Sequence, residues 1–451
     1  MRILTGLQNA IDTLIPVHPW FHPVASDSTL EFIESVFGPG ISPKQAVNII
    51  IERVVSDGDD GVKSLTALMD GVDIDNLVVP RSEIMASYGS VPSNVVDALK
   101  LAAEQINIFH SQQPKGGWID KDRGVGQIIN PIENVGIYVP GGRASYPSTV
   151  LMMAIPAKVA GVPSISITTP PMKNGEIPPV TLVACDIAGV DIVYKVGGPT
   201  AIAALAFGTE SVSQVDKILG PGNLLVQLAK QAVYGVAGID ALQGPTETLI
   251  VADDTSNPVF CAADLLAQAE HDPEARVVLI TKTRSILSKI EEEIEIQLKR
   301  LPESSAAHIS IENNGAFVVV DTDDEIVQFC NQFAPEHLCL LNKEPEKLMP
   351  KLKAAGGIFV GENSPEVLGD YTAGPSHSMP TSLAARHSSP VSVSDFLKIT
   401  SLISVSKERL EAIGPAGVEI AKSENLLAHA QALQFRLDSE IRSLGNGHNG
   451  N

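Results

Sequence analysis

The feature that most constrains this chain begins at about Val135, where short β-branched runs start to alternate with apolar runs of helical periodicity. GIYV, SISITT and DIVYKV are separated by segments of helical character such as STVLMMAIPAKVAGV. Short apolar runs that alternate with helices are typical of parallel strands joined by crossover helices, which cover both faces of the sheet. The pattern therefore predicts an α/β fold.

A second series of the same kind follows the loop LQGPTE, so we expect two α/β units with a boundary there. Its strands are TLIVADD, RVVLIT, AFVVVD, HLCLL and GIFVGE, and its helices are expected near 258–271, 285–301, 322–333 and 344–355. The first hundred residues show helical periodicity, for example after the capping candidate Ser93. From about Ser392 we expect helices without strands, ending in a disordered tail GNGHNGN.

Composition limits the possible partners. With 451 residues the chain is long enough for two to four structural units, and its formal net charge of -21 disfavours non-specific binding to nucleic acid or anionic membrane. No apolar run is as long as a bilayer span. The start MRILTGLQNAIDTLIP contains Asp12 and is interpreted as an amphipathic helix rather than an export signal.

The cysteines argue against a disulfide framework. Cys185, Cys261, Cys330 and Cys339 are scattered and form no C-x-x-C pair. This indicates a reducing, cytoplasmic setting, and it means that any metal is held by nitrogen and oxygen atoms.

Two glycine-rich turns, VGIYVPGGRASYPS and LGPGN, are the first candidates for a nucleotide site. Neither matches the G-x-G-x-x-G fingerprint or a P-loop, although Gly220 and Gly222 allow close backbone approach. Taken alone, each is more often plain turn chemistry than a nucleotide site.

The segment DLLAQAEHDPEARVVLIT contains a candidate metal site. Gln268 and His271 are three residues apart and therefore lie on one helical face, and an amide oxygen with an imidazole nitrogen suits a borderline cation such as zinc. From this pair alone, a polar helix end whose histidine interacts with the helix dipole is the commoner outcome.

Three further segments carry residues of catalytic type. FAPEHLCLL places Glu336 and His337 directly before a strand, where they could form a general acid–base pair or simply a solvated loop pair. The long polar loop GENSPEVLGDYTAGPSHSMPT contains Asp370 and His377. The helical segment ENLLAHAQALQFRL contains Glu424 and His429, and that histidine could equally be packed and hydrogen-bonded in a core.

These segments occur in the order and wording of one family, and from GIYVPGG to HAQALQFRL the chain resembles histidinol dehydrogenase. The resemblance implies two Rossmann-like parallel-sheet domains with helical N-terminal and C-terminal extensions, in a domain-intertwined homodimer. The implied boundaries are a helical arm 1–30, a first α/β domain in two parts at 31–137 and 248–390, a second Rossmann-like domain inserted at 138–247, a helical segment 391–442 that contributes to the partner's site, and a disordered tail 443–451.

The resemblance also implies roles for individual residues. Glu336 and His337 match the catalytic pair. The implied zinc ligands are Gln268, His271, Asp370 and His429; the implied substrate contacts are Thr246, Gln268, His271, His337, Asp370, His377, Glu424 and His429; the implied dinucleotide contacts are Tyr138, Thr200 and Asn223.

The implied reaction oxidises L-histidinol through L-histidinaldehyde to L-histidine with two NAD. In it, His337 acts as general base, Glu336 activates water, and zinc mainly orients the substrate. Thr200 stands where many members have glutamine, and Thr246 where serine is usual. The alternatives are a relative that oxidises another alcohol, such as a sulfonated diol, a zinc hydrolase without nicotinamide, and a non-catalytic scaffold. Glu424 favours histidinol over a sulfonate, because a carboxylate suits a cationic substrate.

Overall fold

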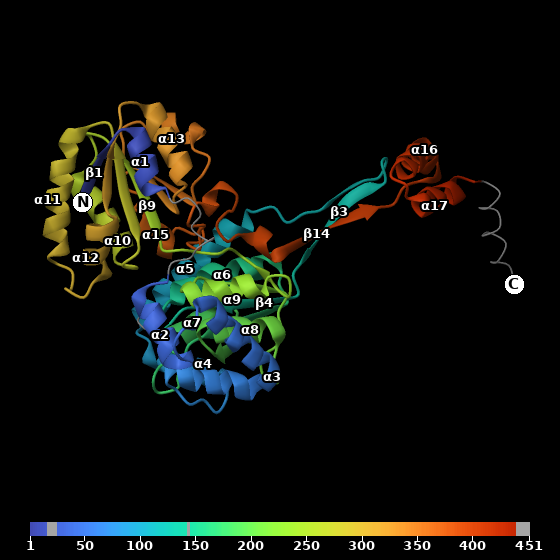
Figure 1. Ribbon diagram of the computed structural model, residues 1–451, viewed down its shortest axis with the longest axis horizontal. Helices are drawn as coiled ribbons and strands as arrows, with labels where there is room; N and C mark the ends of the chain where they lie inside the picture. Colours follow the sequence, from blue (N-terminus) through green and yellow to red (C-terminus); the bar gives the residue numbers. More distant parts are fainter. Residues whose placement is uncertain (16–24, 142–144, 439–451) are drawn as a thin grey trace. The chain divides into compact units, whose positions relative to one another are not determined.

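The structure is a computed structural model that describes residues 1–15, 25–141 and 145–438. The chain forms two compact units (Figure 1). The first unit comprises residues 1–113 and 132–396, and the second comprises 114–131 together with the chain from 397 onward.

The first unit contains a six-stranded, fully parallel sheet. Its order is β1 (Arg2–Thr5), β11 (Ala316–Val319), β10 (Arg276–Thr281), β9 (Glu247–Ala252), β12 (His337–Leu340) and β13 (Gly357–Val360). The helices α10 (Pro258–Ala269), α11 (Leu287–Leu298) and α12 (Ala306–Asn314) cover one face, and α1 (Leu7–Leu14) and α13 (Asp323–Phe333) cover the other (Figure 1). The predicted parallel strands are confirmed, and burial on both faces explains their continuous apolar sequences.

The helix starts follow from local capping. The Thr322 hydroxyl accepts a hydrogen bond from the backbone N–H of Glu325, and the Glu325 carboxylate accepts one from the backbone N–H of Thr322. This capping box stands at the predicted start of α13. Asn257 caps α10, with Pro258 in its first turn. The helix expected near 344–355 is shorter, because it comprises α14 (Pro345–Leu348) and a single 3₁₀ turn, Met349–Lys351.

The first unit also contains a five-stranded parallel sheet. Its order is β6 (Ile192–Lys195), β5 (Ser164–Thr169), β4 (Asn134–Tyr138), β7 (Lys217–Leu219) and β8 (Gly238–Ile239). Its crossover helices are α6 (Pro147–Ala160), α7 (Pro179–Ile187), α8 (Gly198–Phe207) and α9 (Leu224–Val233). The strand order reverses between β4 and β7, and ligands of open α/β sheets bind at the carboxyl ends of strands at such a switch point.

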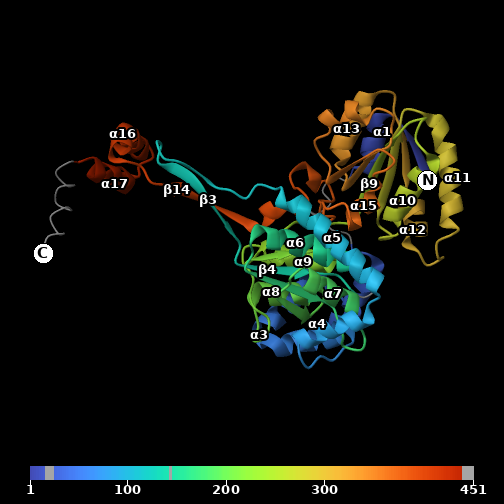
Figure 2. The same cartoon turned by 180° about the vertical axis from the view of Figure 1, so that it is seen from behind.

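The N-terminal helices pack on this five-stranded sheet, which differs from the predicted grouping of 31–137 with 248–390. Side chains of α2 (Asp27–Phe37) and α3 (Pro43–Asp70) share one core with α8 and α9. The helices α4 (Arg81–Ser87) and α5 (Ser93–Ser111) pack on α7 and α6 (Figures 1 and 2). The periodicity of a helix identifies its buried face but not the sheet that this face covers.

The predicted helical arm 1–30 is also wrong in part. Arg2–Thr5 is a strand that pairs in parallel with β11, and only then does α1 begin. Four residues are too few to show a period that distinguishes strand from helix.

The second unit contains a strand where the C-terminal region was expected to be helical throughout. Leu397–Ile403 forms β14, which pairs antiparallel with β3 (Val125–Pro131), and β3 pairs with β2 (Trp118–Asp120). Two helices follow, α16 (Lys407–Ser423) and α17 (Leu427–Leu437). The predicted tail at 443–451 lies outside the described residues.

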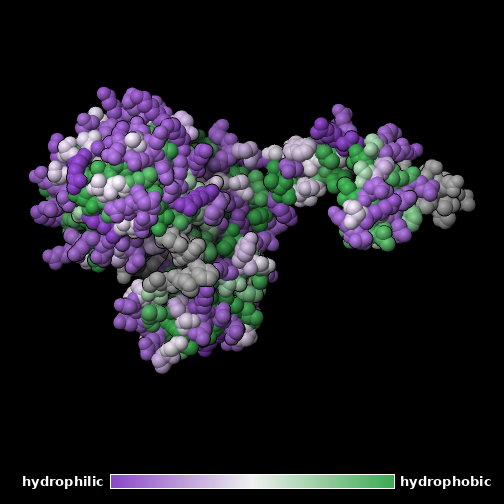
Figure 3. All heavy atoms as spheres, turned by 45° about the horizontal axis from the view of Figure 1, so that its top comes forward, coloured by the Kyte–Doolittle hydropathy of each residue, from purple (hydrophilic) through white to green (hydrophobic). Residues whose placement is uncertain are grey.

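Large apolar side chains are exposed on this unit, and Figure 3 shows hydrophobic residues on its surface. On β14, Ile399 is 60% exposed and Ile403 is 75% exposed. On the two helices, Ile420 is 60% exposed and Leu427 is 65% exposed. Exposed apolar patches of this kind mark interaction surfaces. No helix among the described residues has the length and apolar character needed to cross a bilayer.

A buried ion pair braces the turn that follows β7. Lys230 of α9 pairs with Asp240, just after β8, and both side chains are withdrawn from solvent. The Lys230 ammonium also donates to the Gly220 carbonyl at 2.9 Å, while Asp240 accepts from the Gly220 N–H at 2.9 Å. The pair therefore holds both backbone groups of one glycine in the LGPGN turn.

We predict that Lys230→Met lowers the free energy of unfolding by about 3–5 kcal/mol, because it leaves the Asp240 carboxylate buried without its cation. Denaturant titration measures the change. Lys282→Met is the matched control, since its partner Asp323 is solvent-exposed, and its effect should stay within about 1 kcal/mol. Equal, small losses in both variants would contradict the bracing role.

Candidate active site

The predicted catalytic pair lies at the amino-terminal edge of the six-stranded sheet. His337 begins β12 and is paired in register with Thr248, the second residue of β9. Glu336 and Thr246 stand just before their respective strands, so the pairing of β9 with β12 brings them together. Glu336 and His337 are both buried, which excludes the solvated loop pair.

The Thr246 hydroxyl connects this pair to the first predicted metal ligand. Its Oγ1 lies 2.6 Å from Oε2 of Glu336 and 2.8 Å from Oε1 of Gln268. A hydroxyl has one proton, so it donates to one of these oxygens at a time. Gln268 lies in the last turn of α10, which runs back to the amino edge of the sheet, and it is 1% exposed. The Gln268 amide is thus part of the site rather than of a solvated helix end.

Asp370 and His377 lie on the other side of His337. The Asp370 carboxylate, in α15 (Glu366–Tyr371), is 3.8 Å from Nε2 of His337. His377 Nδ1 is 3.0 Å from the Asp370 carbonyl, and its Nε2 is 3.4 Å from the hydroxyl of Thr149 in α6. Residues of both α/β domains therefore meet at this point.

Burial and charge set the proton affinities of the catalytic pair. Burial raises the pKa of Glu336 to about 7, although the charge of His337 and the Thr246 hydrogen bond oppose the rise. Burial lowers the pKa of His337, but the negative charges of Glu336, Asp370 and Glu366 outweigh it and raise that pKa to about 10. The carboxylates beside the imidazole therefore favour its cationic form once it has taken a proton.

Asp370 stays ionised in this setting. Burial alone would raise its pKa, but the interaction with His337, whose Nε2 is 3.8 Å away, and the charges of His377 and His271 hold it below the usual range. The same charge interactions place His271 within electrostatic reach of both Asp370 and His377. Burial lowers the pKa of His377.

Sequence reasoning missed a further buried acid, Glu366. It is fully buried and accepts hydrogen bonds from Thr248 at 2.7 Å and from the thiol of Cys339 at 3.4 Å. Burial raises its pKa to about 7. In the sequence it is an acid in the first turn of a short helix after Pro365, a common surface arrangement, and only the topology places it beneath His337.

The donor set of the first unit suits a divalent cation of zinc type. Gln268, His271 and Asp370 offer an amide oxygen, an imidazole nitrogen and a carboxylate oxygen. No group of three His, Cys, Asp or Glu side chains within the described ranges is placed to hold a metal by itself. The four cysteines are buried and free, and none of them is among these donors.

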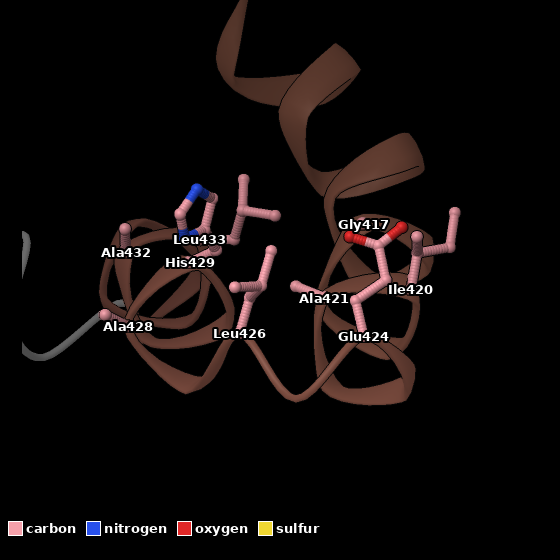
Figure 4. Close-up of a pocket in the computed structure, with 9 residues that line it drawn as sticks. All are labelled: Gly417, Ile420, Ala421, Glu424, Leu426, Ala428, His429, Ala432 and Leu433. Atoms are coloured by element: carbon pink, nitrogen blue, oxygen red, sulfur yellow. The ribbon is translucent and has the colours of Figure 1, made fainter.

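The fourth predicted ligand, His429, belongs to the second unit. His429 is in the first turn of α17, and Glu424 follows the end of α16; both line one groove between these helices (Figure 4). Both side chains are solvent-exposed, so the interpretation of His429 as a packed core histidine is wrong. The two predicted substrate contacts of this unit thus share one surface.

The predicted dinucleotide contacts lie at the carboxyl edge of the five-stranded sheet. Tyr138 ends β4, Asn223 caps α9 after β7, and Thr200 is in the first turn of α8 after β6. A Cβ at Gly220 would stand 2.1 Å from the Tyr138 carbonyl, so only glycine permits this close turn at the switch point. A Cβ placed on Gly198, at the start of α8, would have no atom within 4 Å. This open, glycine-lined edge suits a dinucleotide.

Buried glutamines link the two edges. Gln227 donates to the Gly222 carbonyl at 3.2 Å and accepts from the Gln243 N–H at 2.9 Å. The Gln243 amide donates to the hydroxyl of Ser378, next to His377, at 2.9 Å. The glycine turn after β7 is therefore connected to the loop that carries a predicted substrate contact.

Comparisons with known proteins identify relatives of this chain. The model of the histidinol dehydrogenase family matches residues 41–437. The histidinol dehydrogenase of Deinococcus radiodurans is 48% identical over 415 residues, covering 91% of this chain and 94% of the relative. That of Bacillus cereus is 47% identical over 400 residues, covering 88% and 93%. The crystal structure of histidinol dehydrogenase from Elizabethkingia anophelis has a TM-score of 0.87 at 35% identity and covers 99% of both chains.

We predict that Thr246→Val raises the pKa of Glu336 further above its value of about 7, because the hydroxyl hydrogen bond lowers that pKa in the wild type. The titration midpoint should rise by about one pH unit, as expected for loss of one hydrogen bond to a charged group. Infrared absorption of the protonated carboxyl against pH measures it, with Glu336→Gln as the difference reference. Thr246→Ser keeps the hydroxyl and should keep the midpoint; an unchanged midpoint in Thr246→Val would contradict the prediction.

Proposed function

The chain belongs to the histidinol dehydrogenase family, and from this membership and the site we propose that it oxidises L-histidinol through L-histidinaldehyde to L-histidine with zinc and NAD. It is thus an oxidoreductase of histidine biosynthesis. The observation that carries the proposal is the buried Glu336–His337 pair, in contact with Thr246 and Asp370 and one hydroxyl away from Gln268.

His337 is the group placed to take the proton of the alcohol. Neither of its ring nitrogens has a hydrogen-bond partner within the described residues, so both are available to a substrate. The carboxylates of Glu336 and Asp370 stabilise the imidazolium that forms when the proton is taken. They also orient the ring between them.

Glu336 is the group suited to activate water in the second oxidation. A carboxyl with a pKa of about 7 exchanges its proton readily at neutral pH, as a general base must do. The Thr246 hydroxyl holds one oxygen of this carboxyl, which leaves the other to face a water molecule. His337 would therefore act in the first oxidation, and Glu336 in the second.

The residues that would hold zinc are Gln268, His271 and Asp370 of the first unit and His429 of the second. When bound, zinc supplies a positive charge that orients the imidazole and amino nitrogens of the substrate. Tyr138, Thr200 and Asn223 would hold NAD, which would supply the hydride acceptor for each oxidation. Asp370 and Glu424 surround the substrate with negative charge, which favours cationic histidinol over a sulfonated alcohol.

We further propose a homodimer with shared sites, in which the second unit brings Glu424 and His429 to the partner's first unit. The exposed apolar side chains of β14 and of the two helices support this, since a homodimer interface would bury them. Glu424 and His429 lie on the same unit as this apolar surface.

The stoichiometry tests the reaction. Because conversion of an alcohol to an acid removes four electrons, we expect two NADH per L-histidinol, measured by absorbance with purified protein, zinc and NAD. Activity should disappear after chelation and return with zinc. One NADH per substrate would limit the reaction to the aldehyde, and NADH formation unaffected by the chelator would contradict the role of zinc.

Complementation tests the shared site. Glu336→Gln alters the first unit and His429→Ala the second, so each variant should be inactive alone. When the two are co-expressed, half of the dimers are hybrids with one intact site, and about a quarter of the wild-type activity should return. Glu336→Gln with Asp370→Asn is the control, because both changes are in the first unit and no site is repaired. No recovery in the first mixture would contradict shared sites.

A further inference from the structure

The end of α3 reaches the edge at which the dinucleotide is proposed to bind. The Thr200 hydroxyl lies 3.8 Å from the sulfur of Met69, and the next residue, Asp70, ends α3. An ideal Cβ on Gly197 would stand 3.4 Å from Oδ2 of Asp70. The Gly198 N–H donates to the Tyr138 hydroxyl at 3.3 Å, so Asp70, Tyr138 and the start of α8 form one cluster.

The Asp70 carboxylate is energetically unfavourable where it stands. It forms no hydrogen bond or ion pair within residues 1–15, 25–141 and 145–438, although the same side chain can reach solvent. It is the last residue of a 28-residue helix that has no basic residue in its last turn, and a negative charge at a helix C-terminus is repelled by the helix dipole. Burial of the carboxyl raises its pKa to about 6. An acid that has no partner and stands beside a glycine turn is a candidate binding residue.

The position of Asp70 explains why a charge would be useful there. The Gly197 backbone packs on Pro170, where a Cβ would stand 2.6 Å from the proline Cβ, and Pro170 directly follows β5. In dinucleotide-binding α/β folds, an acid near the end of the second strand binds the adenosine ribose. Here β4 is the first strand and β5 the second, but β5 ends in Thr168–Thr169–Pro170 without an acid. The carboxylate of Asp70, which belongs to α3 and not to the five-stranded sheet or its crossover helices, lies near Gly197 and Pro170 at the end of β5.

We propose that Asp70 accepts hydrogen bonds from the two vicinal hydroxyls of the adenosine ribose of NAD and disfavours the 2′-phosphate of NADP. This rests on the proposed use of a dinucleotide. A carboxylate binds a diol in two places at once and repels a phosphate. Lys195, on the neighbouring strand β6, does not supply a phosphate-binding charge, since it is paired with Glu83 at 3.2 Å.

Calorimetric titration of the protein without metal or substrate tests the proposal, with NAD and NADP as the probes. We expect the wild type to bind NAD more tightly than NADP. In Asp70→Asn the Kd for NAD should rise about tenfold or more, and the ratio of the two Kd values should fall by a similar factor. Thermal stability should not fall, because the substitution removes a charge that the helix end and burial both disfavour, so weaker binding cannot be ascribed to unfolding.

Asp73→Asn is the matched control, since Asp73 is exposed three residues further on and carries the same charge. It should leave both Kd values unchanged. If Asp70→Asn keeps the wild-type Kd for NAD and the wild-type ratio, the role of Asp70 is wrong while the proposed function stands. If the wild type binds neither dinucleotide, the proposed function and the role of Asp70 both fail.

Discussion

The short segment 240–246 determines how the two halves of the site relate. The chain leaves the carboxyl end of β8 at Ile239 and enters the amino end of β9 at Glu247. At one end of the segment Asp240 holds Gly220 of the glycine turn; at the other, Thr246 holds Glu336. In between, Gln243 is bonded to Gln227 and Ser378. This short segment therefore joins the carboxyl edge of the five-stranded sheet to the amino edge of the six-stranded sheet.

This connection explains an unusual location of the catalytic groups. Ligands of parallel α/β sheets bind at the carboxyl ends of strands, as the five-stranded sheet leads one to expect. In the six-stranded sheet the Glu336–His337 pair precedes β12, and Gln268 and Asp370 come from the ends of α10 and α15, which return to the amino edge. That edge is also where the depth of the sheet buries Glu336 and Glu366, and burial raises the pKa of each to about 7. Burial at this edge therefore suits the acid–base role proposed for Glu336.

Sequence predicted the parts of this protein that depend on local pattern. The parallel strands, the capped helix after Thr322 and the pairing of Gln268 with a polar site follow from periodicity, capping and residue type. It did not predict that α2–α5 cover the five-stranded sheet, that Leu397–Ile403 is a strand, that Glu366 is buried beside His337, or that Asp70 lies beside Gly197. These depend on contacts between distant segments: an acid at a helix end looks the same in sequence whether it faces water or a glycine turn.

The first unit offers fewer candidate zinc ligands than a full coordination shell uses, which suggests a role for the second unit. Zinc in a protein normally takes about four ligands. The first unit offers Gln268, His271 and Asp370, while its remaining site histidines, His337 and His377, are committed to the proton-transfer pair and to the Asp370 carbonyl. In the proposed zinc site a fourth donor would come from the second unit, within whose described part His429 is the only histidine. In the proposed shared site, metal binding would therefore depend on the assembly of two chains.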